Sequence, residues 1–393
     1  MSDVRGLVEQ MRGNRTKLAI FNTVRQLGRT TALDVEFRIG LSRPTVLKYL
    51  EQLADDGLVI EHGEGEPSGG RPSRVFEIRS SAAFSVGVDF GAPGLTFALV
   101  DVSKGVIDKM EVETDLEEPP SLTAKRMEDG IRQITLRNEV ELEERVIAVA
   151  VGVPCYIERE TELLQPIPRL PHWENVPLKA VLERELEVPV YIETGPRLMV
   201  IGEREFGGGG DVRNMVYIHV REGIGMGVIV DGRVLKGSKE DVGEIGHTVV
   251  WPQGPVCICG RRGCLEVFAS EPAMVRRMEE MTGRRIGPHQ LFSEVRDGVP
   301  EARKVIEEAM YYLAIAIVNV VELFDPEVVV VGGNIVQGGE FVLRTLREKL
   351  EGMKLDHRGV EVRFSSLGVY AGALGAASFA MESAFNPFPE ASA

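Results

Sequence analysis

Three cysteines and one histidine are grouped in a short stretch of this 393-residue chain. Cys257, Cys259 and Cys264 fall within eight residues, and His247 lies ten residues before the first of them. Three thiolates and one imidazole make a closed tetrahedral zinc site, with no position left open for a substrate. The spacing therefore predicts a structural zinc ion. The alternative is three reduced cysteines in a turn.

The predicted zinc loop has a carboxylate at each end. Glu244 stands three residues before His247, and Glu266 stands two residues after Cys264. A closed metal site contributes rigidity rather than chemistry, because all of its positions are taken by protein ligands. We therefore expect the importance of the ion to lie in holding these two carboxylates in place.

The composition is that of a soluble globular protein, with a hydrophobic fraction of 44% and a charged fraction of 27%. The polar, charged start of the chain argues against a signal peptide. The longest apolar stretch, Tyr311 to Phe324, is interrupted by Asn319 and Glu322, so it indicates a buried helix rather than a membrane span. Four cysteines, three of them assigned to a metal, favour a reducing cytoplasm over a disulfide scaffold.

The net charge of −15 argues against nucleic-acid binding by the whole chain, but the charge is unevenly distributed. Residues 1–80 hold 12 Lys and Arg against 11 Asp and Glu, which is a net charge of +1 and leaves −16 for the remainder. A near-neutral N-terminal part on an acidic body permits DNA contact by the N-terminal part alone.

The first 80 residues have the element order of a winged helix-turn-helix. Apolar spacing predicts three helices and then two strands, over residues 14–27, 32–39, 42–53, 58–61 and 74–78. In this order the third helix enters the major groove of DNA, and the turn between the strands is a wing that can reach the minor groove. The alternative is a small helical interaction domain with a solvated charged face.

The expected DNA contacts lie at the start of the third helix and in the wing. Ser42 is the expected N-cap, and the proline at the next-but-one position fits a first helical turn. Polar side chains near this helix start point outward, which gives the contacts Ser42, Arg43, Thr45, Lys48 and Tyr49. Arg71 follows two glycines in the wing, where an arginine has little packing purpose, so we expect it to contact the minor groove.

After Ser80 the pattern changes to apolar strands that alternate with helical segments. This alternation predicts an α/β body with mixed sheets. The expected strands include 146–153, 188–192, 215–219, 227–230 and 328–332, and the expected helices are 121–136, 178–187, 270–281, 290–297 and 300–323.

The body resembles the ROK family, whose name stands for repressors, open reading frames and kinases. The most specific match is the signature Glu-x-Gly-His…Cys-x-Cys-x4-Cys-x-Glu, which runs from Glu244 to Glu266. Further matches include Asp89-Phe-Gly91 and Gly152-Val-Pro154, and the resemblance covers about residues 12–380. It implies an actin-like ATPase fold, in which two α/β lobes enclose a cleft where kinase members bring ATP and a sugar together.

The resemblance also implies the division of the chain. A winged helix-turn-helix over 1–80 is found on the repressors of the family and is usually absent from its kinases. A first α/β lobe would span 81–197. A second α/β lobe would span 198–393 and contain the zinc loop, with the C-terminal helix returning to the first lobe.

Three departures from the kinase pattern predict that phosphotransfer is lost. The aspartate that serves kinases as base corresponds to Gly195, which removes a contribution of roughly 10²–10⁴-fold. Pro93 removes a backbone N–H from the first phosphate loop, and Glu222 brings a carboxylate into the second. We therefore expect no catalytic residue, and no enzyme.

The resemblance implies that the chain retains the sugar cleft of the family. The implied ligand contacts are Thr194, Glu244, His247 and Glu266. The two glutamates accept hydroxyl protons, and a zinc-bound histidine still offers its second ring nitrogen. Alternatively, Glu244 anchors the zinc loop and Glu266 is a helix-start carboxylate favoured by the helix dipole.

The roles of two further side chains are not decided by the sequence, and they bear on the chemical identity of the ligand. Arg197 either binds an anionic sugar or forms an ion pair with Glu193 or Glu203. His172 either lines the cleft or is a histidine of a surface loop.

Taken together, these features predict a sugar-responsive transcriptional regulator, most simply a repressor. Its partners would be double-stranded operator DNA, a sugar or sugar derivative, and further copies of itself in a homodimer or homotetramer, with no membrane. The alternatives are an active sugar kinase with a DNA-binding head, and a regulator whose cleft is vestigial. Gly195, Pro93 and Glu222 argue against the kinase.

Overall fold

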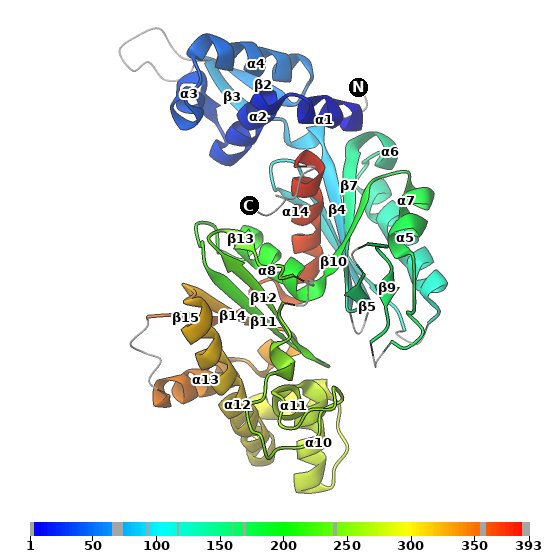
Figure 1. Cartoon of the computed structure of the whole chain (residues 1–393), viewed down its shortest axis with the longest axis vertical. Coiled ribbons are helices and arrows are strands. Elements are labelled where there is room, and N and C mark those ends of the chain that lie inside the picture. The colour runs from blue at the N-terminus through cyan, green and yellow to red at the C-terminus, as the bar shows by residue number, and fades with distance from the viewer. Residues whose placement is uncertain are drawn as a thin grey trace.

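The computed structural model describes residues 4–64, 74–91, 94–115, 118–158, 160–167, 170–238, 242–353 and 359–386. Figure 1 shows three parts stacked along the long axis, namely a helical head and two lobes that are each built on a five-stranded sheet. The predicted fold class, a winged head followed by a two-lobed α/β body, is confirmed.

The head contains four helices and a three-stranded sheet of order β1-β3-β2. These elements are α1 (Val4–Arg12), α2 (Arg15–Leu27), β1 (Thr30–Thr31), α3 (Ala32–Ile39), α4 (Arg43–Asp55), β2 (Val59–Glu64) and β3 (Arg74–Ile78). The side chain of Asn14 caps α2, and Thr31 with Asp34 forms a capping box that fixes the start of α3. Helix α1 was not expected from the sequence.

The first lobe is a mixed sheet of order β10-β7-β4-β5-β6, in which β4, β7 and β10 are parallel. Its strands are β4 (Phe84–Gly91), β5 (Gly94–Asp101), β6 (Val106–Glu113), β7 (Val146–Val153) and β10 (Val190–Thr194). Every residue of β7 is buried, as its unbroken apolar sequence requires of a strand covered on both faces. Helices α5 (Pro120–Arg137), α6 (Leu142–Arg145) and α7 (Leu178–Leu186) belong to this lobe, which also carries the short pair β8 (Tyr156–Ile157) and β9 (Leu164–Gln165).

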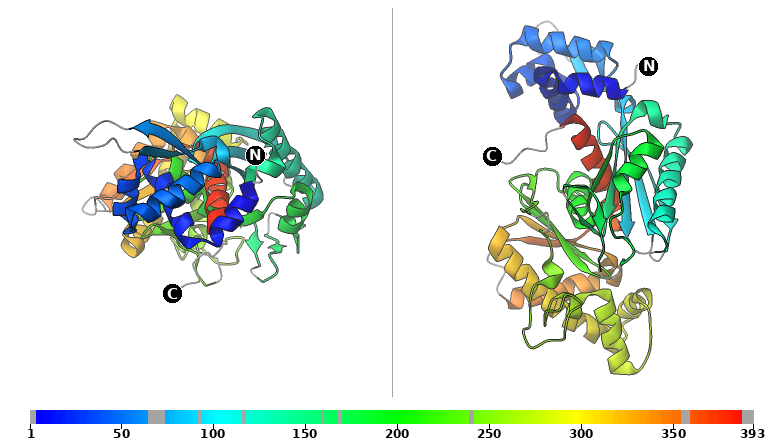
Figure 2. Two further views of the ribbon diagram at one scale, coloured as in Figure 1. Left: turned by 90° about the horizontal axis from the view of Figure 1, so that it is seen from above. Right: turned by 45° about the vertical axis from the view of Figure 1, so that its right-hand side comes forward.

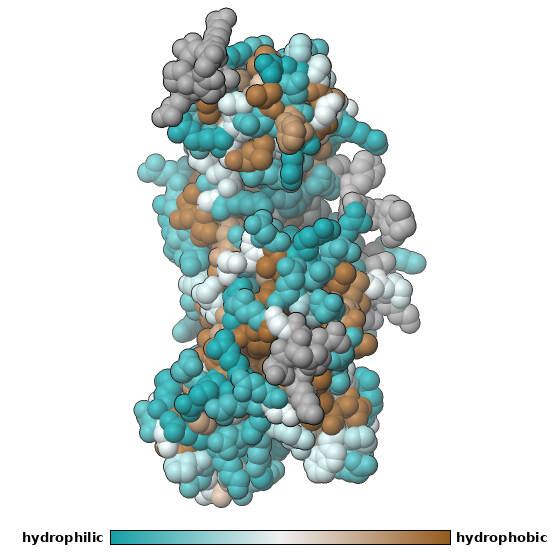
Figure 3. Space-filling view, turned by 90° about the vertical axis from the view of Figure 1, so that its left-hand side faces the viewer, coloured by the Kyte–Doolittle hydropathy of each residue, from teal (hydrophilic) through white to brown (hydrophobic). Residues whose placement is uncertain are grey.

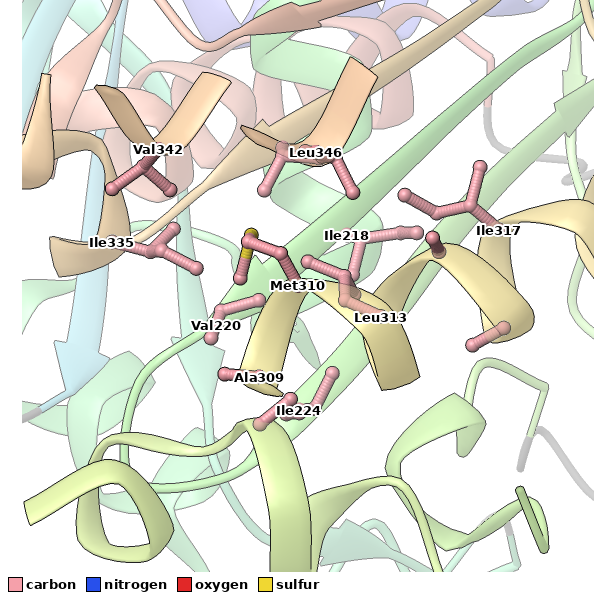
Figure 4. Close-up of a cluster of buried hydrophobic side chains, with 14 of the residues drawn as sticks. Ile218, Val220, Ile224, Ala309, Met310, Leu313, Ile317, Ile335, Val342 and Leu346 are labelled. Carbon is pink, nitrogen blue, oxygen red and sulfur yellow. The ribbon is translucent and has the colours of Figure 1, made fainter. Parts of the chain in front are cut away.

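The second lobe has the sheet order β13-β12-β11-β14-β15. Its strands are β11 (Met215–Val220), β12 (Ile224–Val230), β13 (Arg233–Val234), β14 (Val328–Gly332) and β15 (Glu361–Phe364). Its helices are α9 (Glu266–Ala269), α10 (Glu271–Thr282), α11 (Pro288–Asp297), α12 (Pro300–Phe324) and α13 (Glu340–Gly352). Figure 4 shows Met310 and Leu313 of α12 in one cluster with Ile218 of β11 and Leu346 of α13, and all four are buried.

Two helices join the lobes. Helix α8 (Gly195–Phe206) packs on β11 and β12 of the second lobe, and α14 (Ala371–Phe385) packs on β4, β5 and β7 of the first. The two helices touch each other through glycines: a Cβ on Gly375 would lie 1.7 Å from the carbonyl oxygen of Leu198, and one on Gly202 would lie 2.2 Å from that of Ala371. The alanine- and glycine-rich sequence of α14 therefore brings backbone against backbone at the junction of the lobes.

The head is fixed to the C-terminal end of α14, which Figures 1 and 2 show in red just below it. Arg12 Nε donates to the carbonyl oxygen of Ala384 at 2.7 Å, and Arg25 forms an ion pair with Glu382. The ring centroids of Phe21 and Phe385 are 4.9 Å apart. Helix α14 therefore connects the head to the region where the lobes meet.

The surface mixes residue types, and Figure 3 shows a face where hydrophilic residues dominate and hydrophobic ones form smaller groups between them. Within the described ranges, none of the helices combines the length and the apolar composition that crossing a bilayer requires.

Candidate functional site

A cleft of about 310 Å³ lies between the two lobes. The first lobe contributes the C-terminal ends of β4, β7 and β10, and the second contributes the segment from the end of β11 into β12 together with the start of α9. The carboxyl ends of parallel strands are the usual place for ligand sites in α/β sheets.

All four predicted ligand contacts line this cleft, although they come from both lobes. Thr194 is the N-cap of α8, and its backbone N–H donates to Glu193 Oε1 at 2.7 Å. Glu266 opens α9, and its Oε2 accepts the backbone N–H of Ile224 at 3.3 Å. Glu244 Oε2 lies 3.9 Å from His247 Nε2. Both walls of the cleft thus carry side chains that could accept or donate hydrogen bonds.

Gly195 also lines the cleft, at the first position of α8. A Cβ there would lie 3.6 Å from Asp89 Oδ1, so the space for a side chain exists but no base fills it. The Asp89 carboxyl is itself closely enclosed, since a Cβ on Gly372 of α14 would lie 2.4 Å from its Oδ2. Burial raises the pKa of Asp89 to about 7, and the nearby Arg221 charge lowers it only in part.

The second-lobe edge of the cleft carries polar groups that the sequence reasoning did not single out as ligand contacts. His219 and Arg221 line the cleft beside Glu222, and His219 Nδ1 and Arg221 Nε are buried without a hydrogen-bond partner. Burial, and then the Arg221 charge, lower the pKa of His219 to about 3, so this imidazole is neutral. Arg221 directly follows the apolar strand β11, and a charged residue at the end of such a strand was the signal in the sequence that could have identified it.

Behind Arg221, the carboxyl of Glu271 is buried at the start of α10, with a relative exposure of 2%. Burial and the neighbouring Glu222 raise the pKa of Glu271 to about 7, against the opposing effect of Arg221. Both carboxyls that the Arg221 charge influences, Asp89 and Glu271, therefore hold their protons more tightly than exposed acids do.

The hydrogen-bond partners of Arg197 and His172 decide between the alternatives that the sequence left open for each. Arg197 is 1% exposed and donates through Nη1 to Glu193 Oε1 at 2.9 Å and through Nη2 to the carbonyl oxygen of Lys236 at 3.1 Å. It belongs to an ion pair within the fold, as one of the two alternatives had it. His172 Nε2 lies 3.1 Å from the carbonyl oxygen of Glu118, and His172 does not line the cleft.

The predicted metal ligands meet in one cluster. One ligand atom from each of His247, Cys257, Cys259 and Cys264 lies within 4.8 Å of all the others. His247 Nδ1 is 3.5 Å from Cys257 Sγ, and the Cys259 and Cys264 sulfurs are 3.6 Å apart. A tetrahedral ion with bonds of about 2.1–2.3 Å spaces its ligands roughly 3.4–3.8 Å apart, so the donor set and its spacing fit a metal ion.

The loop that carries the cluster depends on glycine. Gly263 has φ +73°, and a Cβ there would lie 1.6 Å from the carbonyl oxygen of Trp251. The backbone of Arg261 lowers the pKa of the Cys259 thiol to about 6, which favours the thiolate that metals bind. With Nδ1 of His247 toward the sulfurs, its Nε2 is the atom nearer Glu244 and the cleft.

The predicted DNA contacts lie together on α4. Ser42, Arg43 and Lys48 are exposed, whereas Thr45 and Tyr49 are half-buried. Ser42 Oγ is 2.9 Å from Thr45 Oγ1, Arg43 Nε donates to Glu36 Oε2 at 3.0 Å, and Lys48 Nζ is 5.7 Å from the Tyr49 ring centroid. The opposite face of α4 is buried in the head core. Arg71 and Pro93 lie outside the described residues.

The structure has two α/β lobes around a cleft, a cysteine–histidine loop beside that cleft, and an N-terminal head of helices and a small sheet. These features define a body of the sugar-kinase type that carries an additional N-terminal domain. The chain belongs to the ROK family, which matches residues 85–383.

Both repressors and sugar kinases are among the proteins that are similar to the chain. A xylose repressor of Caldicellulosiruptor bescii is 27% identical over 345 residues, 84% of this chain and 86% of the repressor. A glucokinase of Thermotoga maritima is 31% identical over 313 residues, which cover 97% of the kinase but only 76% of this chain.

A crystal structure described as a ROK family transcriptional regulator, homologous to the Escherichia coli Mlc protein, has a TM-score of 0.79 at 24% identity. It covers 95% of this chain and 98% of its own. The fold of the head is therefore shared with a regulator, while the kinase matches less of the chain.

Proposed function

We propose that the protein is a sugar-responsive transcriptional repressor, whose head binds operator DNA and whose kinase-like body senses a sugar or sugar derivative. One observation carries this proposal: α14 starts against Asp89 in the cleft and ends against Phe21 and Arg12 in the head. A ligand that changes the closure of the lobes would move this helix, and with it the head. The repressor relatives and the shared head fold support the same function.

In the proposed cleft, the two glutamates are the principal ligand contacts. Glu244 and Glu266 would each accept a hydroxyl proton, and Thr194 would complete the first-lobe wall. His247 would present Nε2 to the ligand while Nδ1 binds the metal, so that the same ring joins the two sites.

We propose zinc as the ion of the cysteine cluster, in a structural role. Three thiolates and one imidazole suit this metal, and a full set of protein ligands leaves no place for a substrate. When bound, the ion would fix the loop that holds Glu244 on one side and Glu266 on the other. No step of any reaction needs to pass through it.

We further propose that the body does not transfer phosphate. Gly195 supplies no base, and Glu222 lines the cleft where a nucleotide phosphate would meet its negative charge. Asp89 cannot simply replace the base, because Gly152 and Gly372 enclose its carboxyl. The similarity to glucokinases makes an enzymatic function the second candidate, which a kinase assay decides.

The proposed division of the chain is a DNA-binding head over 1–80, a first lobe over 81–197 and a second lobe over 198–393, with α14 packed back on the first-lobe sheet. A cytoplasmic homodimer or homotetramer would present two heads to half-sites about one helical turn of DNA apart, or a multiple of it. The expected DNA contacts are those of α4 together with Arg71.

The proposal is tested by DNA selection followed by binding measurements. The full chain is used to select sequences from random duplexes, and the affinity for the selected duplex is then measured with and without a panel of sugars. Lys48→Ala should weaken binding, because this exposed lysine stands on the outer face of α4. Lys304→Ala removes an exposed lysine from α12 of the second lobe and is the matched control. Equal affinity of the two variants would refute the assigned DNA surface.

A further inference from the structure

Arg221 makes no hydrogen bond or ion pair through its side chain in the part of the chain that the structure describes, and its Nε is buried. An arginine does not lose its proton at any ordinary pH, so it cannot escape burial by becoming neutral. A partly buried guanidinium without an acceptor is costly, and such a group in a cleft indicates a missing partner.

Neither neighbouring carboxyl within the fold supplies that partner. The Arg221 charge acts on Asp89 and Glu271 through space and lowers the pKa of each, but neither carboxyl forms an ion pair with it in the described part of the chain. The Asp89 carboxyl is held by the glycines around it, and Glu271 is buried behind the cleft wall. The raised pKa of each acid shows that the arginine compensates only part of the cost of their burial.

Arg221 adds a cation to a cleft that is also lined by carboxyl groups. Its Nη1 would lie 3.9 Å from a Cβ on Gly91, so the guanidinium reaches across to the end of β4 in the first lobe. The hydroxyl-binding groups Glu244 and Glu266 lie on the side of the metal loop. A ligand that fills the cleft therefore meets the Arg221 cation as well as carboxylates that can accept hydroxyl protons.

We propose that Arg221 binds an anionic group, a carboxylate or a phosphate, on a polyhydroxylated ligand, so that the effector is a sugar acid or a sugar phosphate rather than a neutral sugar. The planar fork of a guanidinium matches both groups. This inference rests on the proposed function and names the class of its effector. The carboxyl groups of Asp89, Glu222, Glu244 and Glu266 line the same cleft. The Glu222 charge that disfavours a nucleotide phosphate also favours an anionic group of low charge, a carboxylate before a phosphate, among several hydroxyls.

The test is calorimetry on the full chain with two matched sets of probes: glucose, gluconate and glucose 6-phosphate, and xylose, xylonate and xylose 5-phosphate. In at least one set, an anionic member should bind about 10- to 100-fold more tightly than its neutral parent, as expected of a charge-assisted hydrogen bond. The stronger of the two anions identifies which group Arg221 binds.

Substitutions test whether Arg221 causes the preference for an anionic ligand. Arg221→Met keeps an unbranched apolar stem but removes the guanidinium, and it should abolish the preference for the anion, whereas Arg221→Lys should retain part of it. Glu222→Gln removes a negative charge beside the same site and should tighten binding of the anion several-fold. Circular dichroism and melting curves check that each variant is folded, and Glu222→Gln tests the inference even if Arg221→Met does not fold.

The outcomes separate this inference from the proposed function. If the neutral sugars bind as tightly as the anions, or if Arg221→Met weakens all probes equally, the inference is wrong while sugar sensing stands. If no probe binds at millimolar concentration, both the inference and the proposed ligand response fail. A preference that Arg221→Met leaves intact would place the anion elsewhere and overturn the assignment.

Discussion

Replacing Phe385 by alanine should disconnect the sensor from the head. Phe385 is the last residue of α14 and is fully buried, with its ring 4.9 Å from that of Phe21 in the head. Truncating a buried phenylalanine costs about 3–5 kcal/mol. Allosteric coupling between two sites amounts to about 1–3 kcal/mol. The free energy lost on truncating Phe385 is therefore at least as large as the coupling free energy that this contact would have to transmit.

The assay is fluorescence anisotropy on a selected DNA duplex, with and without the effector. Phe385→Ala should bind the duplex but lose most of the change that the effector causes. Phe292→Ala is the matched control, because Phe292 is equally buried in the second lobe and far from the head. It should lower stability by a similar amount and keep the response. A full response in Phe385→Ala would show that the signal does not travel through the end of α14.

Three further outcomes are expected. Freshly purified protein should contain about one zinc ion per chain, and Cys259→Ser or chelation should lower both the melting temperature and sugar binding; metal analysis without zinc would contradict this. Coupled ADP assays with hexoses and pentoses should stay at background, also for Gly195→Asp, and sugar-dependent ADP release by the wild type would establish a kinase. Because folding raises the pKa of Asp89 to about 7, from 3.8, its contribution favours the folded state at low pH and is lost as the pH rises toward 7. Denaturant titrations of Asp89→Asn should therefore show a weaker decline of stability between about pH 4 and 7, with Glu271 accounting for part of what remains.

Several individual strands and helices could be predicted from the sequence alone. The bounds of β7 and α12 were predicted to within a residue. Strand β7 is buried throughout and has an unbroken apolar sequence, and the buried residues of α12 recur at helical spacing. Helix α8 was missed, since its first residues were considered only as a departure from a kinase motif. Helix α14 has apolar and small residues all round, so no periodicity marks the face it presents to each lobe.

The site was predictable only where neighbours in sequence are neighbours in space. The cysteine loop is such a case, and its four ligands meet as expected. The roles of Arg197 and Arg221 are the opposite case. Both were charged residues in segments assigned to the cleft region. Arg197 pairs with Glu193 of β10, one of the partners that the sequence offered, whereas Arg221 finds no partner within the described residues, and only the tertiary structure distinguishes the two.

The placement of α14 has a consequence for synthesis on the ribosome. Strand β4 ends at Gly91, but the helix that covers it begins at Ala371, 280 residues later. Translation proceeds at about 5–20 residues per second, so α14 is synthesised roughly 15–60 s after the strand that it covers. The head emerges first and can fold during that interval, so a growing chain would carry the proposed DNA-binding unit before the proposed sensor is complete. Control by the ligand would then begin only when translation ends.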